Sequence, residues 1–229
     1  MGLTISQLKQ LLEEPSHILI DTRSAEQWMD GHIPTSLHIT PATVKYAVAM
    51  GLIDKKSPLV LIVDPAFEKE TIAYFEKAEF ENILGSLEGG YPAWVASNEK
   101  HDILIQVEVD ELAMDIPFDE YLMPLDIRTE EAFNQSHIKN SVSLPLVEFM
   151  DPGSMSELDE HFNIYIISEN GETNTLAASL LKKQGIHNIR VVLDGWEAVQ
   201  FLKDKFSFES IKKAKITKTD PTKTSFLED

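Results

Sequence analysis

Two polar loops hold the residues best suited to chemistry, and each follows a continuous apolar run. The first run, residues 59–63, is followed by Asp64, and the second run, residues 164–167, by a longer loop. Apolar runs of this length predict strands buried on both faces, so each loop is expected at the end of a central strand. The longer loop contains Ser168, Glu169, Asn170, Gly171, Glu172, Thr173 and Asn174.

Ser168 is the candidate nucleophile of the longer loop, but its sequence surroundings do not support that role. A serine hydroxyl needs an adjacent base, and no Gly-x-Ser-x-Gly turn surrounds this serine. We expect Ser168 to cap the following helix instead, sharing that role with Asn170 or Asn174. Glu169 and Glu172 place negative charge where an anionic substrate would bind.

Acidic residues after the first run offer an alternative chemistry. Asp64, Glu68 and Glu70 lie close together in sequence and suggest a carboxylate nucleophile or a metal site. Pro65 and the lack of a nearby histidine disfavour a transition metal, and no two of the seven histidines have the spacing of metal ligands. We therefore predict no metal and no cofactor. An enzyme or a metal- or ligand-binding protein that uses Asp64 or the loop 168–174 stays the alternative.

A second set of polar residues occurs twice, with 105 positions between each residue and its counterpart. An aspartate and an arginine two apart on a strand point to the same side, where they can tie the strand end to the next helix. A histidine then follows a predicted helix end, where its ring can satisfy backbone groups. We interpret all six residues as framework rather than catalytic. They are Asp21, Arg23, His32, Asp126, Arg128 and His137.

The repeat extends over most of the chain and predicts a duplicated domain rather than a solenoid. Strands alternate with helices in each half, which predicts two α/β domains, each a parallel sheet flanked by helices on both faces. We place the domains at residues 1–100 and 101–205, followed by a loosely held, lysine-bearing tail at 206–229. The main predicted strands are 18–20, 37–39, 59–63, 83–87, 103–107, 125–127, 142–144, 164–167 and 189–192, and the main helices are 67–78, 109–113, 130–135, 175–184 and 196–202.

The repeated motifs resemble the opening motif of the rhodanese-like family, which includes sulfurtransferases. An Asp-x-Arg strand end, an acidic-x-aromatic helix and a His-Ile pair occur in this order in both halves. The closing segments, near Gly89-Gly90 and Gly195, are also similar to the family, so the resemblance covers roughly residues 1–205. It implies that active members keep a cysteine directly after the central strand. A six-residue loop then turns its backbone N–H groups toward that thiolate.

This chain departs from the family because it contains no cysteine. Ser168 stands at the cysteine position of the second copy. In the first copy Asp64 is nearest to that position, with Val63 as the alternative, and the loop looks one or two residues short. Pro65 removes one N–H donor there, and Thr173 replaces an arginine that the family often carries in the second loop. We therefore predict a tandem rhodanese-like pseudoenzyme without sulfurtransferase chemistry.

Composition limits the partners. The chain is acidic, with 38 acidic and 20 basic residues and a net charge of −18, so we expect no binding to nucleic acid or to anionic membranes. No apolar stretch is long enough to span a bilayer and the N-terminus does not resemble a secretory signal, which predicts a cytoplasmic protein. We predict a non-catalytic binding, scaffold or regulatory module linked to sulfur metabolism. The expected partner is a protein, either a sulfur-handling enzyme, which the resemblance to the family implies, or a second copy in a homo-oligomer.

Overall fold

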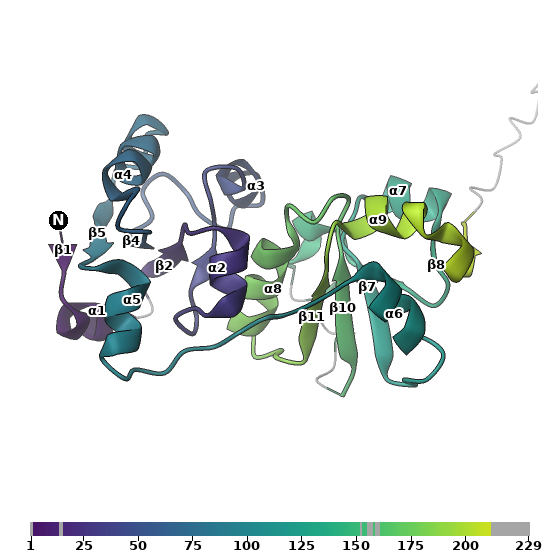
Figure 1. Cartoon of the computed structure of the whole chain (residues 1–229). Coiled ribbons are helices and arrows are strands. Elements are labelled where there is room, and N and C mark those ends of the chain that lie inside the picture. The colour runs from purple at the N-terminus through teal and green to yellow at the C-terminus, as the bar shows by residue number, and fades with distance from the viewer. Residues whose placement is uncertain (1, 14–15, 152, 155–157, 159–160, 212–229) are drawn as a thin grey trace, which may run out of the picture.

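The computed structural model describes residues 2–13, 16–151, 153–154, 158 and 161–211. They form two α/β domains side by side, each built on a five-stranded parallel sheet (Figure 1). This arrangement confirms the predicted fold class. Within the described residues, no helix combines the length and the apolar character that crossing a membrane requires.

The first domain has the sheet order β1-β5-β4-β2-β3. All four residues of its central strand β4 are buried, and alternate side chains point to opposite faces of the sheet. Leu59 and Leu61 join the core beneath α2 and α4, while Val60 and Ile62 join the core beneath α1 and α5. In chain order the elements are β1 (Gly2–Leu3), α1 (Ile5–Leu12), β2 (Ile18–Asp21), α2 (Ala25–Asp30), β3 (Leu37–His38), α3 (Val44–Ala49), β4 (Leu59–Ile62), α4 (Glu68–Lys77), β5 (Ile83–Leu87) and α5 (Gly90–Ala96).

The second domain repeats this plan with the sheet order β6-β11-β10-β7-β9. Ile164 and Ile166 of β10 face the core beneath α8, while Tyr165 and Ile167 face α6 and α9. Its elements are β6 (Ile105–Val107), α6 (Val109–Asp115), β7 (Leu122–Asp126), α7 (Glu130–Gln135), β8 (His137–Ile138), β9 (Val142–Ser143), η1 (Leu146–Glu148), β10 (Asn163–Ile167), α8 (Asn174–Lys183), β11 (Ile189–Val192), α9 (Gly195–Phe201), η3 (Lys203–Lys205) and β12 (Phe208–Glu209).

Helix α8 joins the two domains, because it packs against β3 and α2 of the first domain as well as against its own sheet. Its residues from Asn174 to Leu181 are all buried. Thr175 and Ser179 meet His38 of the first domain. The His38 N–H donates to Ser179 Oγ (3.1 Å), and His38 Nδ1 lies 2.7 Å from Thr175 Oγ1. The second ring nitrogen, Nε2, donates to the Arg23 carbonyl (2.9 Å), and burial lowers the pKa of His38.

The start of the predicted tail is docked on the second domain. Strand β12 pairs antiparallel with β8, and Phe208 packs edge-on against the Trp196 ring at 5.7 Å. The backbone N–H of Ile211 donates to the Asn134 carbonyl (2.9 Å). The prediction of a loosely held tail from residue 206 is therefore wrong as far as Ile211, because apolar Phe206 and Phe208 cover Trp196 and β8 offers a free edge. The rest of the predicted tail lies outside the described residues.

Candidate functional site

The Asp-x-Arg motif of the first domain is a closed polar cluster. Both side chains are buried, and the Arg23 guanidinium donates to the Asp21 carboxylate, with a shortest distance of 2.7 Å. It also donates to the carbonyl of Gly31, at the end of α2 (2.7 Å), and lies 4.0 Å from the centroid of the Tyr91 ring. These contacts tie β2, α2 and α5 together and leave neither charge facing a substrate.

The second domain contains the same cluster with nearly identical distances. Arg128 donates to the Asp126 carboxylate (2.6 Å) and to the carbonyl of Ser136 at the end of α7 (2.8 Å). Its guanidinium lies 3.7 Å from the centroid of the Trp196 ring. Paired hydrogen bonds from a guanidinium to a carboxylate are strong and geometrically specific, so each pair fixes the end of its strand.

The two motif histidines stack on aromatic rings of the preceding helix. His32 stacks on Trp28 and His137 on Phe133, each with centroids 3.8 Å apart. In each case Nδ1 meets the carbonyl of the stacked residue, at 2.9 and 2.8 Å. Burial lowers the pKa of His32 to about 4, so its ring is neutral at pH 7. In the described part of the chain, no group of three or more acidic or histidine side chains could hold a metal ion.

Ser168 follows β10 directly and is buried. Its Oγ accepts a hydrogen bond from the Gly171 N–H (2.9 Å), so the loop curls back onto the hydroxyl. The Ser168 carbonyl accepts from the Trp196 N–H (2.7 Å), and a Cβ on Gly195 would lie only 2.3 Å from that oxygen. Helix α8 begins with Thr173 as its N-cap and without a side-chain cap. The expected capping of this helix by Ser168 is therefore wrong, because the hydroxyl is used inside the loop.

Side chains at the loop 168–174 accept hydrogen bonds from several of its backbone N–H groups. The Asn174 side chain accepts from the Ser168 N–H (3.1 Å) and donates to the Val192 carbonyl (2.7 Å), and Asn170 Oδ1 accepts from the Glu172 N–H (3.2 Å). Together with the Gly171 N–H, which donates to Ser168 Oγ, three N–H groups of the loop therefore have side-chain acceptors. With Glu169 and Glu172 exposed beside them, the loop has little to offer an anion.

The corresponding loop of the first domain is shorter by one residue, with 63–67 between β4 and α4 against 168–173 between β10 and α8. Asp21 pairs with Ile62 as Asp126 pairs with Ile167, so the counterpart of Ser168 is Val63. Sequence reasoning had placed Asp64 nearest to the cysteine position and Val63 second, and the strand register reverses that order. The glycines that face the two loops agree with this assignment. A Cβ on Gly90 would lie 2.5 Å from the Val63 carbonyl oxygen, and a Cβ on Gly195 would lie 2.3 Å from the Ser168 carbonyl oxygen.

Asp64 belongs to the turn that follows. Its carboxylate accepts from the Ala66 N–H (2.9 Å) and from the Gln27 side-chain amide (3.1 Å), and these bonds lower the pKa of Asp64. Asp64 and Glu70 both line a cleft of about 640 Å³ in the first domain. Glu68 instead accepts a hydrogen bond from the Ser86 hydroxyl (2.6 Å). The three carboxylates grouped by sequence therefore do not converge on one point.

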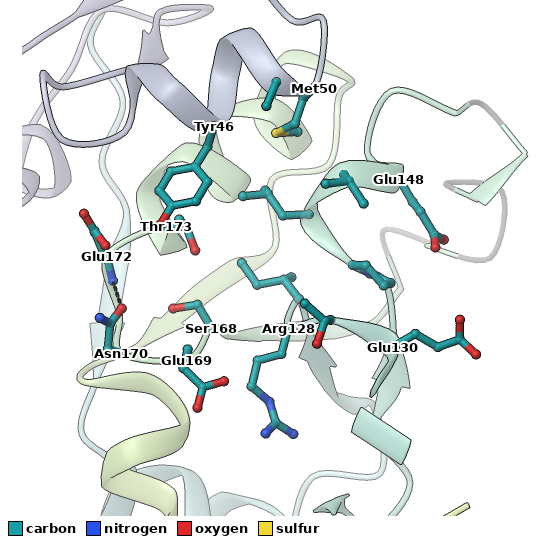
Figure 2. A pocket seen from close by; sticks show the side chains of 16 residues that line it. Tyr46, Met50, Arg128, Glu130, Glu148, Ser168, Glu169, Asn170, Glu172 and Thr173 are labelled. Atoms are coloured by element: carbon teal, nitrogen blue, oxygen red, sulfur yellow. Dashed lines mark hydrogen bonds between the residues drawn. The ribbon is translucent and has the colours of Figure 1, made fainter. Parts of the chain in front are cut away.

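The loop 168–174 opens onto a larger cleft, of about 680 Å³, between the two domains. Figure 2 shows Tyr46 and Met50, from α3 and its end in the first domain, above Ser168 and Thr173 of the second. Glu172 lies at one side of this cleft, and Glu130 and Glu148 lie at the opposite side (Figure 2). The remaining lining residues are Ala49, Ile127, Arg128, Thr129, Pro145, Leu146, Val147, Glu169 and Asn170.

Sequence reasoning found the loop but missed the walls of this cleft. It assigned no element to residues 44–49, and α3 is a short helix without a side-chain cap at its start. Tyr46 and Met50 carry no motif, and nothing local relates them to a loop that lies more than a hundred positions later in the chain. Leu146 in η1 was likewise not expected to line a site.

Comparison with known proteins identifies related sequences for both domains. The Rhodanese-like domain family matches residues 4–97 and 108–201. YrkF of Bacillus subtilis (strain 168), named as a candidate sulfur carrier protein, is 31% identical over 99 residues, or 43% of this chain and 52% of YrkF. The thiosulfate sulfurtransferase GlpE of Pseudomonas savastanoi pv. phaseolicola is 27% identical over 88 residues, or 38% of this chain and 81% of GlpE.

The match to YrkF thus spans about half of that protein's length. Among solved structures, a thiosulfate sulfurtransferase from Pseudomonas aeruginosa is 12% identical, with coverage of 93% of this chain and 44% of that chain and a TM-score of 0.40.

Proposed function

Because the chain belongs to the rhodanese-like family through both of its domains, and has no cysteine for the family's chemistry, we propose that it is a non-catalytic binding module. One observation carries the proposal. The residue that follows the central strand, where the family places its nucleophile, is Val63 in the first domain and Ser168 in the second. Val63 has no reactive atom, and the Ser168 hydroxyl is buried and accepts a hydrogen bond from within its own loop.

The surroundings of Ser168 support the same proposal. A serine nucleophile needs a neighbouring base to remove its proton, whereas Ser168 Oγ is held by the backbone N–H of Gly171. A sulfur donor such as thiosulfate is an anion, and Glu169 and Glu172 beside the loop would repel it. The alternative of an enzyme or metal site built on Asp64 has no comparable support, because that carboxylate is used in a turn.

The link to sulfur metabolism rests on the relatives. YrkF is named as a candidate sulfur carrier protein and GlpE as a thiosulfate sulfurtransferase, and both match one domain's length of this chain. We infer that the chain works beside such proteins, through contacts with a protein partner rather than through its own sulfur transfer.

A sulfurtransferase assay with engineered cysteines tests the proposal. In the family reaction, a thiolate attacks the outer sulfur of thiosulfate, sulfite leaves, and cyanide then removes the bound sulfur as thiocyanate and regenerates the thiolate. The natural chain should form no thiocyanate above the buffer rate. Turnover with thiosulfate or 3-mercaptopyruvate would overturn the proposal.

Two single substitutions make the result informative. Ser168→Cys puts a thiol where the Gly171 N–H already points, so slow thiocyanate formation is expected, faster when Glu172→Gln removes a nearby negative charge. Val63→Cys in the shorter loop is the matched control and should stay inactive. If Ser168→Cys is as inactive as Val63→Cys, the second loop has not kept the shape of an active loop.

A further inference from the structure

The cleft between the domains has apolar walls drawn from both of them. Tyr46, Ala49 and Met50 come from the first domain, and Leu146 and Val147 from η1 of the second. Val147 is 68% exposed, and Met150, just beyond η1, is 46% exposed. An exposed apolar surface that lies between domains and is rimmed by charge is typical of a site for a protein or peptide ligand.

Apart from Arg128, the charged side chains that line this cleft are all glutamates. Glu130, Glu148, Glu169 and Glu172 all line it and are all exposed. Among the described residues, none of these four carboxylates forms a salt bridge. Arg128 also lines the cleft, but its guanidinium is paired with the buried Asp126 carboxylate, which compensates its charge. The rim therefore carries about four uncompensated negative charges around apolar walls.

We propose that this cleft binds a basic, apolar segment of a partner protein, with arginine or lysine side chains directed at the glutamates and apolar side chains against Tyr46, Met50 and Leu146. The proposal rests on the proposed function and specifies the chemistry of the partner. An anionic ligand is disfavoured because Glu169 and Glu172 add negative charge at the loop and because side chains accept from the N–H groups of Ser168, Gly171 and Glu172. Lys45 Nζ lies 4.8 Å from the centroid of the Tyr46 ring, so we assign that ring to an apolar side chain of the partner rather than to a cation.

Fluorescence anisotropy with the full chain tests the proposal. The probe is a fluorescein-labelled peptide of alternating leucine and arginine, and the control peptide carries glutamate in place of arginine. At low ionic strength the arginine peptide should bind and the glutamate peptide should not. Glu169→Gln with Glu172→Gln should weaken binding roughly tenfold, and Tyr46→Ala should weaken it by a similar factor. Raising the salt to about 0.5 M should weaken binding to the natural chain.

Two matched variants separate this cleft from the overall charge of the protein. Glu76→Gln with Glu120→Gln removes the same charge from exposed positions away from the cleft and should change affinity by less than about twofold. Glu26→Gln with Glu70→Gln removes it from the cleft of the first domain and should also have little effect. Equal weakening by either control pair, or equal binding of the glutamate peptide, would overturn the proposal.

Failure of this proposal is distinct from failure of the proposed function. If the arginine peptide does not bind while the natural chain forms no thiocyanate, the basic partner is ruled out and the non-catalytic proposal stands. If thiocyanate forms, the non-catalytic proposal fails whatever the peptide does.

Discussion

The loop after β4 and the loop after β10 occupy equivalent places in two domains whose frameworks match closely. The Asp–Arg pairs have shortest distances of 2.7 and 2.6 Å, and both histidine stacks have centroids 3.8 Å apart. The loops differ in nearly every contact. The second curls around Ser168 and closes its own hydrogen bonds, whereas the first is one residue shorter, begins with Val63 and turns on Asp64.

This contrast separates the parts of the fold that stability requires from the parts that chemistry requires. A buried arginine cannot lose its carboxylate without leaving an unpaired charge, so the framework tolerates little change. A loop without a nucleophile has no reacting atom to position and can take any shape that satisfies its backbone.

The largest expected effect tests whether the two frameworks are equivalent. Arg23→Ala or Arg128→Ala leaves Asp21 or Asp126 buried and unpaired, which should lower the free energy of unfolding by about 3–5 kcal/mol in each case. Urea denaturation at pH 7 measures the loss. Lys9→Ala, which breaks the exposed Lys9–Glu99 pair, should cost under about 1 kcal/mol. A much smaller loss for one arginine than for the other would show that the clusters are not equivalent.

The histidine of the first framework should make stability depend on pH. The pKa of His32 is lowered from 6.5 to about 4 by burial. As the pH falls below about 6.5, the unfolded chain binds a proton that the folded chain does not, so stability falls by about 3 kcal/mol by pH 4. Urea denaturation between pH 7 and pH 4.5 should therefore show a shallower slope for His32→Gln than for the natural chain.

Substitutions of two other histidines test whether the pH dependence of stability comes from His32. His101→Gln, at an exposed position, is the control for loss of a histidine outside the framework. His137→Gln measures the contribution of the matching stack in the second domain. A slope for His32→Gln equal to that of the natural chain would contradict the role given to His32.

The glycines that face the two loops should show that both domains need the same close approach. In Gly90→Ala the new Cβ would lie 2.5 Å from the Val63 carbonyl oxygen, and in Gly195→Ala it would lie 2.3 Å from the Ser168 carbonyl oxygen. Both glycines have a positive φ. We expect each substitution to cost roughly 2–3 kcal/mol in urea denaturation. Gly51→Ala, with φ +69 and no atom within 4 Å, isolates the backbone term and should cost about 1 kcal/mol. Equal losses of stability at Gly51, Gly90 and Gly195 would show that the close approach to the two carbonyls adds no cost.

The smallest effect separates the loops themselves. Ser168→Ala deprives the Gly171 N–H of its acceptor in a buried place and should cost about 1–2 kcal/mol, with faster hydrogen exchange at the Gly171 amide. Asp64→Ala deprives the Ala66 N–H of its acceptor in an exposed turn, where water replaces it, and should cost under about 1 kcal/mol. A larger loss for Asp64→Ala than for Ser168→Ala would reverse this view of the two loops.

Much of the framework could be predicted from sequence because its causes are local. Strand β5, helix α7 and strand β11 have the predicted bounds, since apolar runs and turn residues define them. Ser24 and Gln27 form a capping box at the start of α2, a contact within four consecutive residues. The parallel sheets followed from the alternation of strands and helices.

Errors arose where distant segments meet. Strand β12 forms because β8 offers a free edge and Trp196 an uncovered face, neither of which is visible in the residues of the tail. Strand pairing with β2 makes Val63 rather than Asp64 the counterpart of Ser168, and the spacing of 105 that relates the motif residues agrees (168 − 63). Helix α3 is short and has no side-chain cap, so its sequence gives little local signal.

The lack of cysteine is enough to rule out a thiolate for sulfur transfer, and the recurrence of the motif residues at one spacing is enough to predict that the two halves share one framework. What the second loop faces depends instead on how the domains pack. Helix α8 is buried between its own sheet and the first domain, and that packing brings α3 over the loop 168–174. A cleft with walls from two domains depends on how the domains pack, and no local pattern encodes that arrangement.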